Sequence, residues 1–219
     1  EADCHIIHYE QAAYAQLFGV AAQAIATPSG VMTVEQLRAA FRADDVHFPR
    51  TRLMCLEITH YRKGGRVLAW DEVATACLWA SEAGLARHLD GARLLNASAA
   101  SGIPPAQWAS LFDTVSVCFS KGLGAPVGSA LVGDADSAYR ARRHRKALGG
   151  GMRQAGVLAA AVLHALDHHV ERLVDDHARA QRLASAIDEL PHLALPTPQI
   201  DTNLVFFQID PEWGDAETF

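Results

Sequence analysis

Residues 115–128 read VSVCFSKGLGAPVG, and the fold of the whole chain is best inferred from them. Apolar and small polar residues alternate from Val115 to Ser120, which predicts a strand with one apolar face. The strand ends at Lys121, and the glycines and proline that follow predict a tight turn. A lysine buried at a strand end is costly to desolvate, and burial lowers the pKa of a lysine as Schiff-base formation requires. The commoner alternative for this stretch alone is a lysine that reaches from the strand into solvent.

Strands and helices alternate on both sides of this stretch. The hydrophobic patterns predict further strands at 52–58, 85–89, 129–132 and 203–209. They predict helices at 9–18, 70–83, 104–112, 135–147 and across 154–190, where two helices are an alternative. Another helix begins after Thr33, where Gln36 completes a capping box. This alternation is typical of an α/β fold with a mainly parallel central sheet and helices on both faces.

The composition limits the classes of function. Half of the 219 residues are hydrophobic and a fifth are charged, as expected for a globular protein with a core. The net charge of -6 disfavours nucleic acid and anionic membranes as partners. The basic run at 140–146 has no interleaved aromatic residues for stacking on bases, which favours a solvated helix face. No apolar run has the ~18 residues of a membrane-spanning helix.

The cysteines and the two ends of the sequence give weaker indications. The four cysteines are scattered without a CxxC pair, which predicts reduced thiols in a cytoplasmic protein. Cys55 and Cys118 lie in apolar strand-like runs, where we expect them to be buried. The sequence starts at Glu1 without a methionine and stops at Phe219, shortly after a predicted strand. We therefore expect both ends to be truncated.

Asp90 is the second candidate for chemistry. It follows the predicted strand at 85–89, and α/β sheets bind ligands at the carboxyl ends of their strands. An acid there and a lysine at the end of a later strand would face one crevice, and pyridoxal phosphate (PLP) needs such a pair. The lysine forms the imine, while the carboxylate keeps the pyridine nitrogen protonated. A strand-end aspartate that caps the following turn is the alternative.

Several segments resemble the low-specificity L-threonine aldolases, which are PLP enzymes of the aspartate-aminotransferase fold type. The two longest are HLDGARL at 88–94 and SKGLGAPVG at 120–128. Shorter matches follow the order of the family along nearly the whole chain: His5-Ile6 with Tyr9-Glu10, DVHF at 45–48, Glu57 with Thr59-His60, GGGMRQAG at 149–156, and Thr202-Asn203. Each match alone is weak, and together they are specific.

This resemblance implies that PLP is the cofactor, and it assigns residues to hold it. Lys121 would bind PLP covalently, and Asp90 would pair with the pyridine nitrogen. Arg93 would help to hold the cofactor and the substrate. Arg153 would reach the cofactor phosphate of a neighbouring subunit, so that self-association as a dimer or tetramer would be needed for function.

The resemblance also implies a reaction, the cleavage of L-threonine or L-allo-threonine to glycine and acetaldehyde. His5 would stack on the pyridine ring near the substrate hydroxyl, and His60 would be a second imidazole near that hydroxyl. Histidine is suited to moving a proton near neutral pH. Ile58 and Tyr61 stand where the family usually has asparagine, so the substrate preference near the hydroxyl stays open.

The same resemblance implies a division into domains. Residues 1–198 would form a PLP-binding large domain that is incomplete at its N-terminus, and residues 199–219 would begin a small domain. The turn that cradles the cofactor phosphate and the arginine that binds the substrate carboxylate would lie outside this sequence.

Several alternatives remain beside this interpretation. One is another PLP-dependent lyase reaction, either β-elimination or cleavage of phenylserine-like substrates. A second is a catalytically silent fragment that acts only as an oligomerising subunit. A metal-dependent hydrolase is more distant. His164 and His168 form an i,i+4 pair, but the sequence specifies no third ligand nearby, and we expect no metal.

Overall fold

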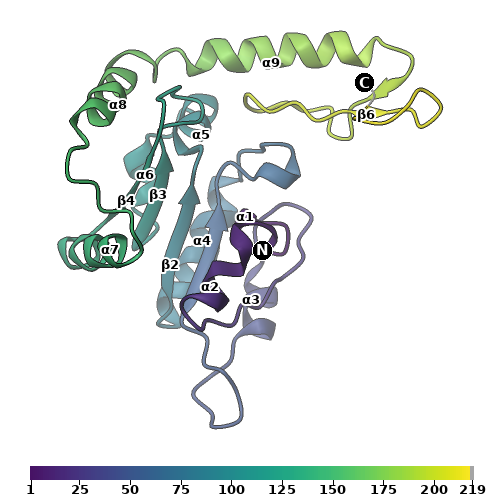
Figure 1. The fold of residues 1–219 in the computed structure, drawn as a ribbon. Helices are drawn as coiled ribbons and strands as arrows, with labels where there is room; N and C mark the ends of the chain where they lie inside the picture. The colour runs from purple at the N-terminus through teal and green to yellow at the C-terminus, as the bar shows by residue number, and fades with distance from the viewer. Residues whose placement is uncertain (218–219) are drawn as a thin grey trace.

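The structure is a computed structural model that describes residues 1–217. A four-stranded sheet lies at its centre, with the strands in the order β1-β2-β3-β4. The first three, β1 (Leu53–Glu57), β2 (Ala86–Gly91) and β3 (Thr114–Cys118), run parallel, and β4 (Ser129–Gly133) is antiparallel to β3. Figure 1 shows β2, β3 and β4 side by side. The predicted mainly parallel α/β sheet is confirmed.

The register of the parallel strands brings their carboxyl ends to one edge. Glu57 at the end of β1 lies opposite Asp90 of β2, and Asp90 lies opposite Ser116 of β3. The backbone amide of Ile58 then donates a hydrogen bond of 2.8 Å to the carbonyl of Asp90. Residues that follow β1, β2 and β3 are therefore neighbours at this edge.

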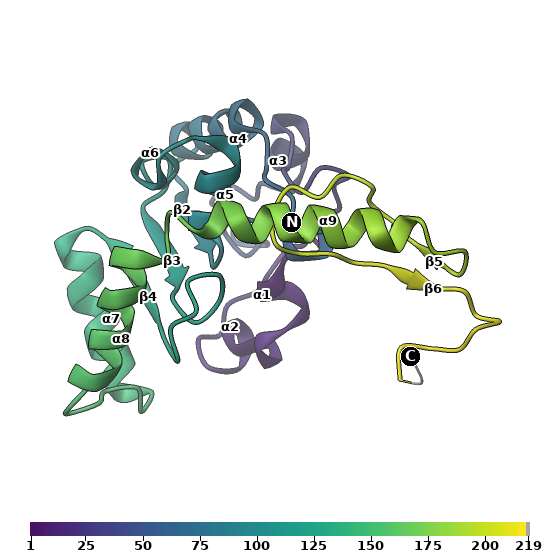
Figure 2. The same cartoon turned by 90° about the horizontal axis from the view of Figure 1, so that it is seen from above.

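Helices cover both sides of the sheet. Figure 2 shows one group of helices on one side of the sheet and the short N-terminal helices on the other. The first group is α3 (Val34–Ala40), α4 (Trp70–Glu82) and α6 (Pro105–Ala109), and the second is α1 (His5–His8) and α2 (Ala13–Gln16). The capping box predicted for α3 is present, since Thr33 accepts from the Gln36 amide while the Gln36 side chain accepts from the Thr33 amide.

The main core packs the strands against α4 and α6. Leu56 of β1 and Leu89 of β2 contact this core together with Val73 and Trp108, and each of these side chains is at most 1% exposed. Burial of one such side chain stabilises the fold by about 1.5–3 kcal/mol. These buried side chains hold β1 and β2 against α4 and α6.

The helix predicted at 9–18 is wrong. The chain instead forms α1, a 3-10 turn (η1, Glu10–Ala12) and α2. Glu10, Gln11 and Ala12 have φ of 61°, 54° and 51°, which is left-handed backbone and interrupts any continuous helix. Leu17 and Phe18 are 61% and 53% exposed, so a helix here would have no apolar face to bury.

The chain after the sheet is mostly helical. It forms α7 (Ala135–Ala147), as predicted, then α8 (Gly156–His168) and α9 (Leu173–Asp188), which are the two helices given as an alternative for 154–190. The helix α5 (Leu94–Ser101) was not predicted. Figure 1 shows α9 extending away from the sheet, with the C-terminal segment running beside it.

The predicted strand at 203–209 is reduced to its last two residues. These form β6 (Gln208–Ile209), which pairs with β5 (Leu193–Ala194). The preceding residues contact the main body instead of a strand. Thr202 Oγ1 donates to the carbonyl of Gly65, and the Asn203 side chain accepts from Asn96 of α5.

Two further expectations concern the cysteines and the membrane. All four thiols are free, but Cys55 and Cys118 are only half-buried, because each lies on the less covered face of its strand. Within residues 1–217, no helix combines the length and the apolar character needed to cross a bilayer.

Candidate active site

Asp90 lies at the carboxyl edge of the sheet, as predicted. Its side chain is half-buried, and Oδ1 accepts a hydrogen bond of 3.1 Å from the backbone amide of Ala92. Gly91 allows β2 to lie close to β3, because a Cβ atom at Gly91 would be 2.7 Å from the carbonyl oxygen of Ser116. This close packing fixes the carboxylate at the edge.

Lys121 follows β3 on a loop that is anchored to two helices. Gly122 packs against α5, where a Cβ atom would lie 2.6 Å from Asn96 Oδ1. His169, which follows α8, hydrogen-bonds the carbonyl of Leu123 through Nδ1 at 2.6 Å. The lysine itself is exposed, as in the commoner alternative for this stretch. The loop reaches solvent because the residues that support it pack under Gly122 and Leu123, not around Lys121.

Glu57 connects the N-terminal segment to the end of β1. The residue is 3% exposed, and its carboxylate accepts hydrogen bonds from the backbone amides of His5 and Tyr61, the latter at 2.8 Å. Because Glu57 lies opposite Asp90, this contact brings His5 to the same edge of the sheet as Asp90. The imidazole of His5 packs on Tyr9 at 4.4 Å between ring centroids, and its Nδ1 lies 2.7 Å from the Glu10 carboxylate.

Arg93 reaches the same edge from the turn after β2. Its guanidinium carbon lies 5.6 Å from the centroid of the Tyr61 ring, a cation–π contact. The Tyr61 ring also contacts Phe206 at 5.3 Å and lies 6.1 Å from His5. Within residues 1–217 Arg93 forms no ion pair, so its half-buried positive charge is free to bind an anion.

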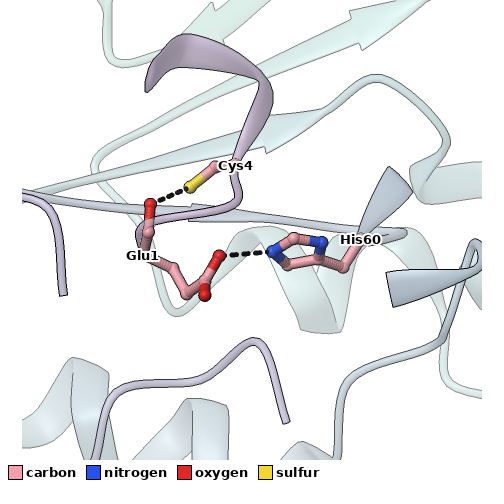
Figure 3. Close-up of side chains that lie close together, drawn as sticks. All are labelled: Glu1, Cys4 and His60. Carbon is pink, nitrogen blue, oxygen red and sulfur yellow. Dashed lines mark hydrogen bonds and ion pairs between the residues drawn. The ribbon is translucent and has the colours of Figure 1, made fainter. Parts of the chain in front are cut away.

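His60 lies deeper than the sequence suggested. It is fully buried, and its Nε2 lies 2.7 Å from the carboxylate of Glu1, whose side chain is also fully buried (Figure 3). The other ring nitrogen, Nδ1, has no hydrogen-bond partner among the described residues. Cys4 Sγ donates to the backbone carbonyl of Glu1 at 2.9 Å, and burial raises the pKa of this thiol.

The pKa of the Glu1 carboxyl is set by opposing effects. Burial raises it, but the hydrogen bonds from His60 and from the Asp3 amide outweigh burial, so that the pKa lies below its usual value. Glu1 is therefore an ionised, buried carboxylate beside an imidazole.

Arg153 is not brought to this edge. It lies in the segment that links α7 to α8, which Figure 1 shows beyond β4, and its side chain is exposed. The His164 and His168 rings lie 4.4 Å apart on α8, and among the described residues no third ligand joins them. The basic run of α7 buries no residue, in keeping with a solvated face.

The sequence interpretation assigned no role to four supporting residues. Glu57 was recognised only as a family match. A carboxylate at the end of an apolar strand is rarely buried without a partner, and this was the signal in the sequence that it has a structural role. Asn96 and His169 support the Lys121 loop, and His177 in turn contacts Asn96 at 3.1 Å. Nothing in the local sequence pattern of these polar residues distinguishes them from surface residues.

Known proteins match both the sequence and the fold. A probable low-specificity L-threonine aldolase 2 of Arabidopsis thaliana is 41% identical over 98% of this chain and 62% of its own length. The low specificity L-threonine aldolase of Escherichia coli K12 is 40% identical over 85% of this chain and 54% of its own length. This chain thus spans about half to three fifths of the length of these relatives.

The solved structures agree. A putative aromatic amino acid beta-eliminating lyase/threonine aldolase from Exiguobacterium has a TM-score of 0.81 and 25% identity over 91% of this chain and 54% of its own. A putative L-allo-threonine aldolase from Listeria monocytogenes has a TM-score of 0.79 at 21% identity over the same shares, which supports the fold alone. The sequence profile of the beta-eliminating lyases matches residues 1–210. The chain therefore belongs to the beta-eliminating lyase family.

Proposed function

We propose that this chain catalyses the PLP-dependent cleavage of L-threonine or L-allo-threonine to glycine and acetaldehyde. The observation that carries this proposal is the meeting of Asp90, His5 and Arg93 at the carboxyl edge of a parallel sheet, next to the loop of Lys121. The similarity to proteins named low-specificity L-threonine aldolase supports the choice of reaction.

The residues at this edge fit PLP. The half-buried Asp90 carboxylate can accept a hydrogen bond from a protonated pyridine nitrogen, and Lys121 offers an accessible amine. Arg93, which has no acidic partner in the described chain, can bind an anionic group of the cofactor or of an amino-acid substrate. When bound, PLP would supply the conjugated ring that takes up the electron pair of the broken Cα–Cβ bond.

Each side chain at the site would have a separate role. Lys121 would anchor the cofactor through Nζ, and Asp90 would hold a proton on the ring nitrogen. His5, whose backbone is fixed by Glu57, would orient the ring by stacking and lie near the substrate hydroxyl. His60 would be a second imidazole near that hydroxyl, and its Nδ1 has no hydrogen-bond partner among the described residues.

Self-association is part of the proposal. Arg153 is exposed, as an arginine that reaches into a neighbouring subunit would be before assembly. The neighbouring helix α8 also presents large apolar side chains to solvent, with Val157 87% and Leu163 60% exposed. Such a face favours a dimer or tetramer of this chain.

A spectrum of the chain with added PLP tests the cofactor assignment. We expect a visible absorption band, and after borohydride reduction a modified peptide that contains Lys121. Lys121→Ala should lose the band and at least about 10³-fold in turnover, because the covalent anchor is lost. Lys146→Ala, which changes an exposed lysine of α7, is the matched control and should keep both. A label on another lysine would contradict the assignment.

The products distinguish the reaction from the main alternative. Retro-aldol cleavage gives glycine and acetaldehyde, whereas β-elimination gives ammonia and a keto acid. Glycine and acetaldehyde in equal amounts from L-threonine or L-allo-threonine are the expected result. Ammonia with a keto acid would replace the proposed reaction by β-elimination on the same cofactor.

A further inference from the structure

The buried pair Glu1–His60 has a feature that packing alone does not explain. One imidazole nitrogen, Nε2, is held by a carboxylate at 2.7 Å, while Nδ1 is buried and unpartnered in the described chain. A buried polar atom without a partner is costly, and such atoms in native proteins commonly have a catalytic or binding role. The arrangement leaves one defined nitrogen of His60 for another molecule.

The charges around Glu1 bear on which ring nitrogen of His60 carries a proton. Glu1 Oε2 also accepts from the Asp3 amide at 2.8 Å, and Oε1 lies 3.3 Å from Thr27 Oγ1 and 3.9 Å from Lys63 Nζ. Lys63 forms a closer ion pair with Asp3 at 2.6 Å. Lys63 therefore lies near both carboxylates, so Glu1 has a cation beside it other than His60.

The tautomer of His60 follows from this geometry. An ionised carboxylate only accepts hydrogen bonds, so the proton of the Glu1–His60 bond must be on Nε2. A second proton on Nδ1 would be a buried donor without an acceptor, which is unfavourable. His60 is thus neutral, with its lone pair on Nδ1, and the carboxylate makes the ring a better acceptor there.

A shared metal ion does not account for the pair. Glu1, Cys4 and His60 bring an oxygen, a sulfur and a nitrogen within 4.8 Å of one another. Two ligands of one tetrahedral zinc at about 2.0–2.1 Å are roughly 3.3 Å apart. The 2.7 Å contact is shorter and matches a charge-assisted hydrogen bond, and Cys4 Sγ is already bonded to a carbonyl.

We infer that Glu1 is a positioning residue that holds His60 as the neutral Nε2–H tautomer, with Nδ1 as the acceptor for the β-hydroxyl of the substrate. The tautomer depends only on contacts within the chain, and the substrate part rests on the proposed function. Glu1 would not touch the substrate, and its effect would pass through the imidazole.

The first test observes the proton directly. In chain labelled with 15N-histidine, long-range 15N–1H spectra should give one of the eleven histidines a slowly exchanging downfield proton on Nε2 and an unprotonated Nδ1. The signal is assigned to His60 by its loss in His60→Gln. Glu1→Met, which removes the acceptor at similar volume, should abolish the slow exchange, while Glu1→Gln, whose amide oxygen can accept, should retain it.

Asp44→Asn is the control, because it removes an exposed carboxylate that pairs with Arg50 and with neither Lys63 nor His60. It should leave the His60 signal unchanged. A proton on Nδ1, a signal that survives Glu1→Met, or a shift of the signal on adding one equivalent of zinc sulfate would each overturn the inference. Circular dichroism of Glu1→Met checks that the variant is folded, and Glu1→Gln keeps the test decisive if it is not.

The second test concerns the reaction. With PLP, Glu1→Met should lower kcat by at least about tenfold with KM nearly unchanged, and Glu1→Gln should restore most of the loss. An unchanged kcat would show that the Glu1–His60 pair does not act on the substrate. If the wild-type chain with PLP gives no visible band and no label on Lys121, the proposed function is wrong. The tautomer of His60 is measured without the cofactor, so that result tests the tautomer independently.

Discussion

The carboxylate of Glu57 shows how one buried charge builds the edge of the sheet. It receives two backbone amides, from His5 and Tyr61, and it lies opposite Asp90. In Glu57→Gln one acceptor oxygen becomes an NH₂ donor that faces an amide donor. We expect this change to lower the free energy of unfolding by about 1–3 kcal/mol, measured by urea denaturation. The N-terminal segment with His5 should lose protection from hydrogen exchange first.

The control for this prediction is Glu171→Gln, which makes the same chemical change at an exposed position and should stay within about 0.5 kcal/mol of wild type. Equal stability of the two variants would mean that Glu57 does not fasten the N-terminal segment to the sheet.

The positions of Asp90 and Lys121 could be predicted from the sequence because each residue directly follows a hydrophobic strand pattern. The Glu1–His60 bond could not, since it joins residues 59 apart in sequence and no periodicity links them.

Strand β2 illustrates a constraint at the level of elements. The last residue of β2 is Gly91, and a methyl group there would meet the backbone of β3 at 2.7 Å from the Ser116 carbonyl. Backbone cannot rotate away as a flexible side chain can, so Gly91→Ala should push the strands apart next to Asp90. We expect a loss of about 1–3 kcal/mol in the free energy of unfolding, measured by urea denaturation.

The comparison for Gly91 is Gly156→Ala at the first residue of α8, where no atom lies within 4 Å of the added methyl group. That change should be neutral or should stabilise the helix by up to about 1 kcal/mol. A Gly91→Ala protein as stable as wild type would show that β2 and β3 can separate at this edge without cost.

Elements with a strong local pattern were predictable, and those set by distant contacts were not. The alternation from Val115 to Ser120 and the helical pattern of 70–83 predicted β3 and α4 correctly, with ends shifted by a residue or two. The helix α5 was missed because LLNASAAS has no clear amphipathic period, and its Asn96 is buried against residues far along the chain. The helix predicted at 9–18 was wrong although the composition favours a helix, because Glu10, Gln11 and Ala12 have left-handed backbone.

At the scale of the whole molecule, the surface around α8 is unusually apolar. The sequence of this helix, GVLAAAVLHALDH, is apolar on nearly every side, yet only Ala165 is buried in the single chain. A helix that is apolar all round is normally buried on all sides. Figure 1 shows α8 at the outside of the molecule, connected to α7 by the segment that contains Arg153. The same region thus holds both the exposed apolar face and the arginine proposed to act in a neighbouring subunit.

The double variant Val157→Glu/Leu163→Glu tests whether this face joins copies of the chain. Burial of each of these side chains contributes about 1.5 kcal/mol or more, so losing both costs about 3 kcal/mol and weakens the Kd of self-association about 100-fold. Sedimentation velocity over a range of concentrations should show dissociation to monomers. Leu78→Glu, at a 62% exposed position on α4, should leave the assembly intact. If the double variant sediments like wild type, the α8 face is not the interface, and Arg153 loses its route to a neighbouring site.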